Sequence, residues 1–249
     1  MKTYYRKKIH TTILFIILVL LTYDASSQRS VTQQSQYWFG YMTSTEISAH
    51  YSWWNDTHYV PDGFFIVRTG LTYTIKKINI TAGYAHAWLP ISNSNTDLHR
   101  NENRPWGQVQ FTLPIFKTLS FTQRTRYDGR FIQNVSQGEP IEKYTFVNRI
   151  RFMGSIRKTF PTVGNKENIP FISLSDEILF NFGENISGMS FNQNRIYVMV
   201  GLQKPRIQYQ VGYMNRFVMT GTDQYIENHT LVLWITQKFS FRKRAVSEK

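Results

Sequence analysis

The sequence predicts an all-β protein, an antiparallel up-and-down transmembrane β-barrel of about 10 strands, possibly 12. Three observations carry this prediction. Apolar and polar residues alternate at period two in one segment after another, which is typical of strands with two different faces. Charged residues make up only 18% of the 249 residues, while aromatic residues make up 16%. No apolar run reaches the roughly 20 residues that a membrane-spanning helix needs, so strands are the remaining means of crossing a membrane.

The first segment, residues 1–27, is predicted to be a secretory signal peptide. A basic start precedes an apolar run from Ile13 to Leu21, which is too short to span a bilayer as a helix. Small residues at Ala25 to Ser27 supply a cleavage site. We therefore expect an exported chain with a polar N-terminal segment at 28–35, an outer-membrane β-barrel at 36–241 and a basic tail at 242–249.

Ten candidate strands follow, each roughly 9–16 residues long, which suits tilted strands that cross an apolar band about 25 Å thick. Their expected bounds are 36–48, 63–75, 78–89, 105–113, 118–131, 143–158, 169–182, 193–204, 206–217 and 226–241.

The expected connections alternate in length. Tight turns follow the second, fourth and eighth candidates, as at Lys76-Lys77 and Lys204-Pro205, and longer polar stretches follow the odd-numbered ones. Only the connection near 160–168 departs from this pattern. Alternating short turns and long loops are typical of outer-membrane barrels, and an even strand number places both chain ends at the periplasmic side.

Aromatic residues are expected in a girdle at the outer rim, because amphipathic rings favour the headgroup layer of a membrane. The residues placed at or near this rim are Trp88, Trp106, Tyr127, Phe131 and Tyr144.

Two adjacent candidates, 118–131 and 143–158, carry arginines on one face. A charge on the lipid face costs about 2–4 kcal/mol at the midplane of the membrane, so these columns should point into the barrel. The same parity turns Arg68 and Arg216 inward, with Glu46 and Glu177 as acids. Asp176 falls on the outward parity, so either a bulge turns it inward or the register of that strand differs. The expected interior network comprises Arg124, Arg126, Asp128, Arg130, Arg149, Arg151 and Arg195.

Two interpretations of this interior remain open. Arginine forks paired with acids can fill a narrow barrel as a structural plug. Alternatively, the excess of arginine over acid attracts a small anionic solute, as in a solute or anion channel. The formal net charge of +13 would ordinarily suggest nucleic acid, but export and barrel patterning account for it better.

No catalytic residue is assigned. A third hypothesis is a lipid-modifying enzyme of the phospholipase or lipid A deacylase type, built on His86 with Ser92 or Ser94, but no spacing motif supports a triad. His99 and Glu102 alone are too few for a metal site, and the chain has no cysteine. We therefore expect neither a metal nor a cofactor.

Three stretches together resemble a known family. They are NENRPWGQVQF at 101–111, FTQRTRYDGRF at 121–131 and YTFVNRIRF at 144–152. They are similar to the exported Gram-negative barrel proteins of domain of unknown function 2490, whose motif matches Glu102, Arg104, Trp106 and Gln108 here. Asp128 stands where that family usually has Glu. The resemblance implies a barrel and a location but no reaction.

The leading hypothesis is therefore a non-enzymatic outer-membrane barrel with a narrow arginine-lined interior. Its expected partners are outer-membrane lipid, lipopolysaccharide and, during biogenesis, the barrel-assembly machinery.

Overall fold

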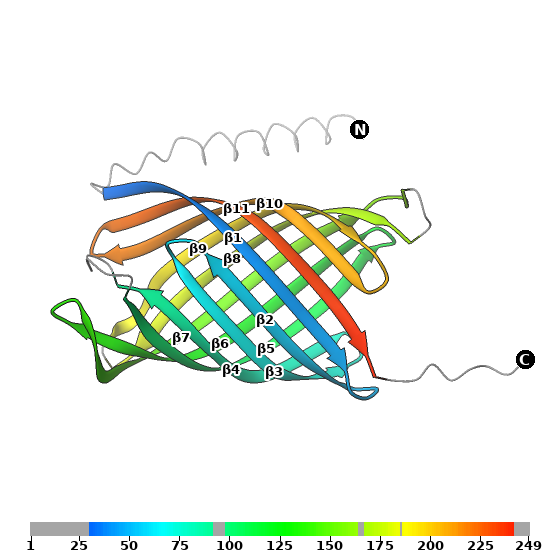
Figure 1. The fold of residues 1–249 in the computed structure, drawn as a ribbon. Helices are drawn as coiled ribbons and strands as arrows, with labels where there is room; N and C mark the ends of the chain where they lie inside the picture. Colours follow the sequence, from blue (N-terminus) through cyan, green and yellow to red (C-terminus); the bar gives the residue numbers. More distant parts are fainter. Residues whose placement is uncertain (1–29, 92–97, 164–166, 185, 242–249) are drawn as a thin grey trace, which may run out of the picture. The chain divides into compact units, whose positions relative to one another are not determined.

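The computed structural model describes residues 30–91, 98–163, 167–184 and 186–241. They form one closed barrel (Figure 1), which confirms the predicted all-β barrel. The eleven strands are β1 (Ser30–Glu46), β2 (Tyr51–Val60), β3 (Phe64–Ile75), β4 (Ile78–Pro90), β5 (His99–Phe116), β6 (Leu119–Ser136), β7 (Glu139–Thr159), β8 (Ile169–Gly183), β9 (Ile186–Gln203), β10 (Ile207–Gly221) and β11 (Gln224–Ser240).

Each strand lies beside its neighbours in the sequence, and β1 meets β11 to close the barrel. Pairing along the chain is antiparallel, as between β6 and β7. Because eleven is an odd number, β1 and β11 run in the same direction, and both end at the same end of the barrel (Figure 1). The expected purely antiparallel barrel with an even strand number is therefore wrong at this seam, and the start of β1 and the end of β11 lie at opposite ends.

One strand, β2, was not predicted. It occupies a stretch that was expected to be a polar loop, and it pairs with β1 and β3 along its length. Its alternation is hard to recognise because both faces carry polar residues: Asn55 and Thr57 on one face, Asp56 and His58 on the other. Only the pairing within the closed sheet shows that this segment is a strand.

The expected alternation of short and long connections is also wrong. The tight turns at 76–77 and at 204–206 are present, but β6 and β7 are joined by Gln137-Gly138, and β10 and β11 by only two residues. Positive φ angles of 51° at Gln137 and 55° at Asp223 accommodate these turns. The strands are longer than expected because polar residues at their ends continue the ladder.

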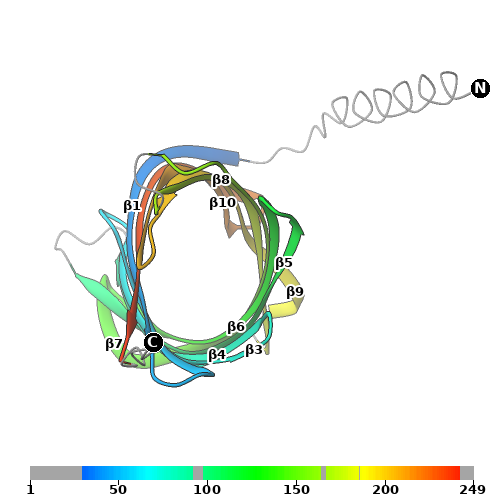
Figure 2. The same cartoon turned by 90° about the vertical axis from the view of Figure 1, so that its right-hand side faces the viewer.

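The two faces of the sheet have opposite chemistry. Among the described residues, 44 large hydrophobic side chains are exposed, whereas the buried positions comprise 12 hydrophobic and 16 polar or charged residues. Viewed from one end (Figure 2), the strands enclose a single interior. No helix among the described residues is long and apolar enough to cross a membrane. The barrel thus has an apolar outside and a mixed interior, in which buried polar and charged residues lie beside hydrophobic clusters around Trp38 and Trp106.

The bulge considered for Asp176 is absent, and the residue keeps its outward parity. Asp176 is exposed and accepts a hydrogen bond of 2.6 Å from Nδ2 of Asn194 on β9. The irregularity in β8–β9 pairing falls later, at Leu179 and Phe180, so no bulge turns Asp176 inward.

Candidate functional site

The candidate site is the arginine-rich interior of the barrel. β6 and β7 place their charged columns side by side, with Arg126 opposite Arg151 and Asp128 opposite Arg149. In a strand every second side chain points to the same face, so these residues all enter the interior together. The structure places all seven residues of the expected network on inward positions of β6, β7 and β9.

The three motif residues of β5 lie deep inside rather than at the rim. Glu102 is fully buried, and Arg104 and Trp106 are also buried. The expected rim position of Trp106 is therefore wrong: its even-numbered parity on β5 points inward, whereas Trp88 on β4 points outward. A glycine makes room for the indole ring, because a Cβ added to Gly70 would lie 3.0 Å from the Trp106 ring.

Glu102 binds two arginines. Its Oε1 lies 2.6 Å from Nη2 of Arg104 and 2.6 Å from Nε of Arg130, and Nη2 of Arg130 donates to Oε2 at 2.8 Å. The Arg130 contact is a bidentate fork, the strongest geometry for a guanidinium and a carboxylate. One motif acid thus holds two strands together from within.

Two further acids hold the middle of the interior. Asp128 Oδ2 lies 2.5 Å from Nε of Arg151, and Glu177 accepts from Arg124 at 2.6 Å and from Arg195 at 3.1 Å. Glu177 on β8 thus links Arg124 on β6 to Arg195 on β9, although these two arginines are far apart in the sequence. These contacts therefore tie together four consecutive strands, β6 to β9, from the inside.

A fourth acid, Asp56, was missed together with the strand that carries it. Arg68 donates to both carboxylate oxygens of Asp56, at 2.7 and 2.8 Å. His58 on the same strand is buried beside Asp56, at 3.4 Å, and accepts a 2.8 Å hydrogen bond from Nε1 of Trp38. The alternating Asp-x-His pattern was the sequence signal that could have revealed this group.

Several interior arginines lack a carboxylate within ion-pair distance in the described part of the chain, and Arg126, Arg149, Arg157 and Arg216 are among them. Arg126 donates to Gln108 and lies over the Trp106 ring, with its guanidinium carbon 4.6 Å from the ring centre. Arg149 donates from Nε to Asn181 at 3.0 Å, and Arg216 donates from Nε to Gln193 at 3.0 Å. The excess of interior arginine over acid that the sequence predicts is thus found at these side chains.

Within the described part of the chain, three cavities lie along the interior. We call the two ends of the barrel the β1–β2 end and the β2–β3 end, after the connections located there. A cavity of about 180 Å³ lies toward the β2–β3 end and one of about 240 Å³ lies next to it. A third, of about 390 Å³, lies toward the β1–β2 end. The residues that line both of the first two cavities are Trp38, Arg68, Arg151 and Arg195.

The residues of the lipid-enzyme hypothesis do not assemble into a triad among the described residues. His86 points outward on β4, and its Nδ1 lies 2.9 Å from Oδ1 of Asn103, which also accepts from the Tyr84 hydroxyl at 2.6 Å. Ser92 and Ser94 lie outside the described residues. Within the described ranges, no group of three His, Cys, Asp or Glu side chains could hold a metal ion.

Comparison with known proteins identifies a family for this chain. The chain belongs to a family of proteins of unknown function, DUF2490, whose model matches residues 35–227, and this confirms the resemblance drawn from the motifs. Neither a curated protein nor a solved structure matches the chain.

Proposed function

We propose that this protein is an integral outer-membrane β-barrel with a closed, charge-paired interior, and that it acts as a membrane scaffold rather than as an open pore. The observation that carries the proposal is the inverted distribution of polarity. A soluble protein rarely exposes a contiguous apolar patch larger than a few hundred Å². Here the outward faces of neighbouring strands are apolar all around the barrel, while ion pairs occupy the interior.

The strand lengths fit this proposal. A membrane-spanning strand needs about 9–11 residues. The shortest strand, β2, has 10 residues, and the longest, β7, has 21. Every strand is therefore long enough to cross an apolar layer, and the long ones extend beyond it.

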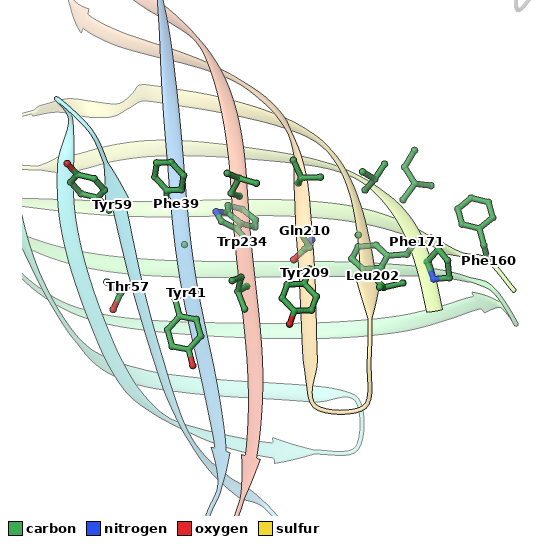
Figure 3. A pocket seen from close by; sticks show the side chains of 18 residues that line it. Phe39, Tyr41, Thr57, Tyr59, Phe160, Phe171, Leu202, Tyr209, Gln210 and Trp234 are labelled. Atoms are coloured by element: carbon green, nitrogen blue, oxygen red, sulfur yellow. The ribbon is translucent and has the colours of Figure 1, made fainter. Parts of the chain in front are cut away.

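An outer groove at the seam also needs an apolar cover. It has a volume of about 1110 Å³ and runs along β2, β1, β11, β10, β9 and β8. Figure 3 shows Phe39 and Tyr41 on β1 near Tyr209 on β10 and Leu202 on β9. Acyl chains of membrane lipid would fill such a surface without any specific partner.

Outward tyrosines mark one interface of the proposed membrane. The hydroxyls of Tyr84 and Tyr127 donate, each at 2.6 Å, to Asn103 and Asn148 on the following strand. The Tyr213 hydroxyl likewise lies 2.6 Å from Nδ1 of His229 on the following strand. A tyrosine side chain combines an apolar ring with a hydrogen-bonded hydroxyl group, and such side chains favour the membrane–water boundary.

Heat-modifiable gel migration and membrane fractionation test the membrane proposal. We expect the folded chain to partition with outer membranes, to insert into phospholipid vesicles, and to shift its gel mobility only after boiling. Recovery of the folded protein from the soluble periplasmic fraction would overturn the proposal.

Planar bilayer recordings test the closed interior. Because ion-paired side chains such as Arg68, Arg151 and Arg195 occupy the interior, we expect inserted protein to show no sustained conductance. A steady anion-preferring current would instead favour the channel alternative.

A further inference from the structure

We propose that the cavity toward the β2–β3 end is a binding site for one small oxyanion of the phosphate class. The inference deepens the proposed function and rests on it for a closed interior. The cavity has a volume of about 180 Å³. Arginines from β3, β5, β6, β7, β9 and β10 converge on it, so the site exists only in the assembled barrel.

The charge of the cavity wall is strongly unbalanced. Seven arginines line it, together with a single carboxylate, that of Glu102. Glu102 is fully buried and already binds Arg104 and Arg130. The lining arginines are Arg68, Arg104, Arg130, Arg149, Arg151, Arg195 and Arg216.

Two of these arginines have only neutral partners in the described part of the chain. Arg149 is 6% exposed, and its Nε donates to the amide oxygen of Asn181 at 3.0 Å. Arg216 donates from Nε to Gln193 at 3.0 Å and from Nη1 to Gln36 at 3.5 Å. The remaining lining arginines have Asp56, Glu102, Asp128 or Glu177 as counterions.

A buried guanidinium without a counterion is unfavourable, because burial removes hydration that neutral amides replace only in part. A bound anion supplies the missing charge. Guanidinium forks match the oxygens of phosphate and carboxylate through paired, charge-assisted hydrogen bonds. Arg149 on β7 and Arg216 on β10 can thus grip one anion from different strands.

The size and wall of the cavity restrict the ligand. Its volume equals that of about six liquid waters, enough for one small oxyanion with a few waters. Phe64, Leu89 and Val218 add an apolar rim close to the strand ends. We favour phosphate over a monocarboxylate because phosphate has more acceptor oxygens and more charge to share between two unpaired arginines.

Titration of the folded full-length protein in detergent with inorganic phosphate tests the site. We expect saturable binding by calorimetry and a rise of the thermal midpoint. Arg149→Gln and Arg216→Gln should each weaken phosphate binding by at least about tenfold, because each removes a charge-assisted contact.

Arg157→Gln is the matched control, because it removes the same charge elsewhere in the interior. Arg157 is half-buried toward the β1–β2 end and donates to Gln203 and Gln208 at 2.6 and 2.8 Å. Its variant should bind phosphate like the wild type. Equal weakening by Arg157→Gln and Arg149→Gln, or no saturable binding by the wild type, would overturn the site.

A second measurement covers the possibility of misfolding. Without oxyanion, Arg149→Gln should unfold at the same or a higher temperature than the wild type, because it removes an unpaired buried charge. Arg151→Gln, which breaks the ion pair with Asp128, should unfold at a lower temperature. A midpoint of Arg149→Gln as low as that of Arg151→Gln would show a structural role and contradict the proposal.

Further measurements distinguish the source of the phosphate, and they separate failure of this inference from failure of the membrane proposal. Tighter binding of glycerol phosphate than of inorganic phosphate would identify an esterified headgroup, and the reverse order a free ion; either supports the class. Succinate binding as tight as phosphate binding would overturn it. A chain that inserts into vesicles but binds no phosphate contradicts this inference alone, whereas one that binds phosphate but never inserts contradicts the membrane proposal alone.

Discussion

Asp128 has no solvent exposure, and its one ion-pair partner in the described chain is Arg151. Asp128→Asn keeps the size of the side chain but leaves the Arg151 guanidinium buried without its counterion. Breaking one side of a buried pair typically costs about 3–5 kcal/mol. We therefore expect a clear fall in the denaturant midpoint of unfolding, measured in detergent micelles.

The matched control is Asp176→Asn. Asp176 is also an acid in the middle of a strand, but it is exposed, and within the described ranges its hydrogen-bond partner is Asn194. Its replacement should change the free energy of unfolding by no more than about 0.5 kcal/mol. An equal loss of stability in the two variants would contradict a special role for the buried pair.

Residue-level prediction succeeded where one physical rule decided the outcome. The cost of a charge against lipid was enough to expect Arg124 and Arg151 on inward faces. It was not enough to find their partners, because Arg124 and Glu177 are 53 residues apart and meet only once β6, β7 and β8 have paired in register. Trp106 was misplaced for a related reason: an aromatic ring suits either a rim or a packed interior, and only the parity of β5 distinguishes them.

At the scale of the strands, apolar alternation located most of the ladder but neither β2 nor the true strand ends. β6 was expected to end at 131 and continues to Ser136, and β7 begins at Glu139 rather than at 143. Outside the apolar band polar residues satisfy the ladder equally well, so hydrophobic periodicity ends before the strand does.

Close contact between β3 and β4 depends on glycine. A Cβ added to Gly83 would lie 2.0 Å from the carbonyl oxygen of Thr69, which is backbone and cannot rotate away. Gly83→Val should therefore lose at least about 1–3 kcal/mol of stability through overpacking, and we expect a reduced heat-modifiable fraction after refolding into micelles.

Gly107→Ala provides the control on the neighbouring strand β5. Its added Cβ would have Thr81 O at 3.7 Å as the nearest atom, which is an ordinary contact. This variant should refold like the wild type. A normal refolding yield for Gly83→Val would show that β3 and β4 separate more easily than the register implies.

At the scale of the whole molecule, the closure between β1 and β11 is the exceptional contact, because it joins parallel strands. Parallel pairing is slightly less stable per residue than antiparallel pairing. Phe241 N reaches Glu46 O at 3.4 Å, and Tyr41 donates across the seam to Gln237 at 2.7 Å. The barrel should therefore open first at this seam.

Amide hydrogen exchange in detergent tests this expectation. β1 and β11 each have 17 residues, whereas the antiparallel neighbours β3 and β4 have 12 and 13. If strand length determined protection, the seam would exchange more slowly than β3 and β4. We expect the opposite, with central amides of β1 and β11 exchanging first, since local opening follows the weakest pairing rather than the longest strand. Slower exchange at the seam than at β3 and β4 would show that side chains such as Tyr41 compensate fully for the parallel ladder.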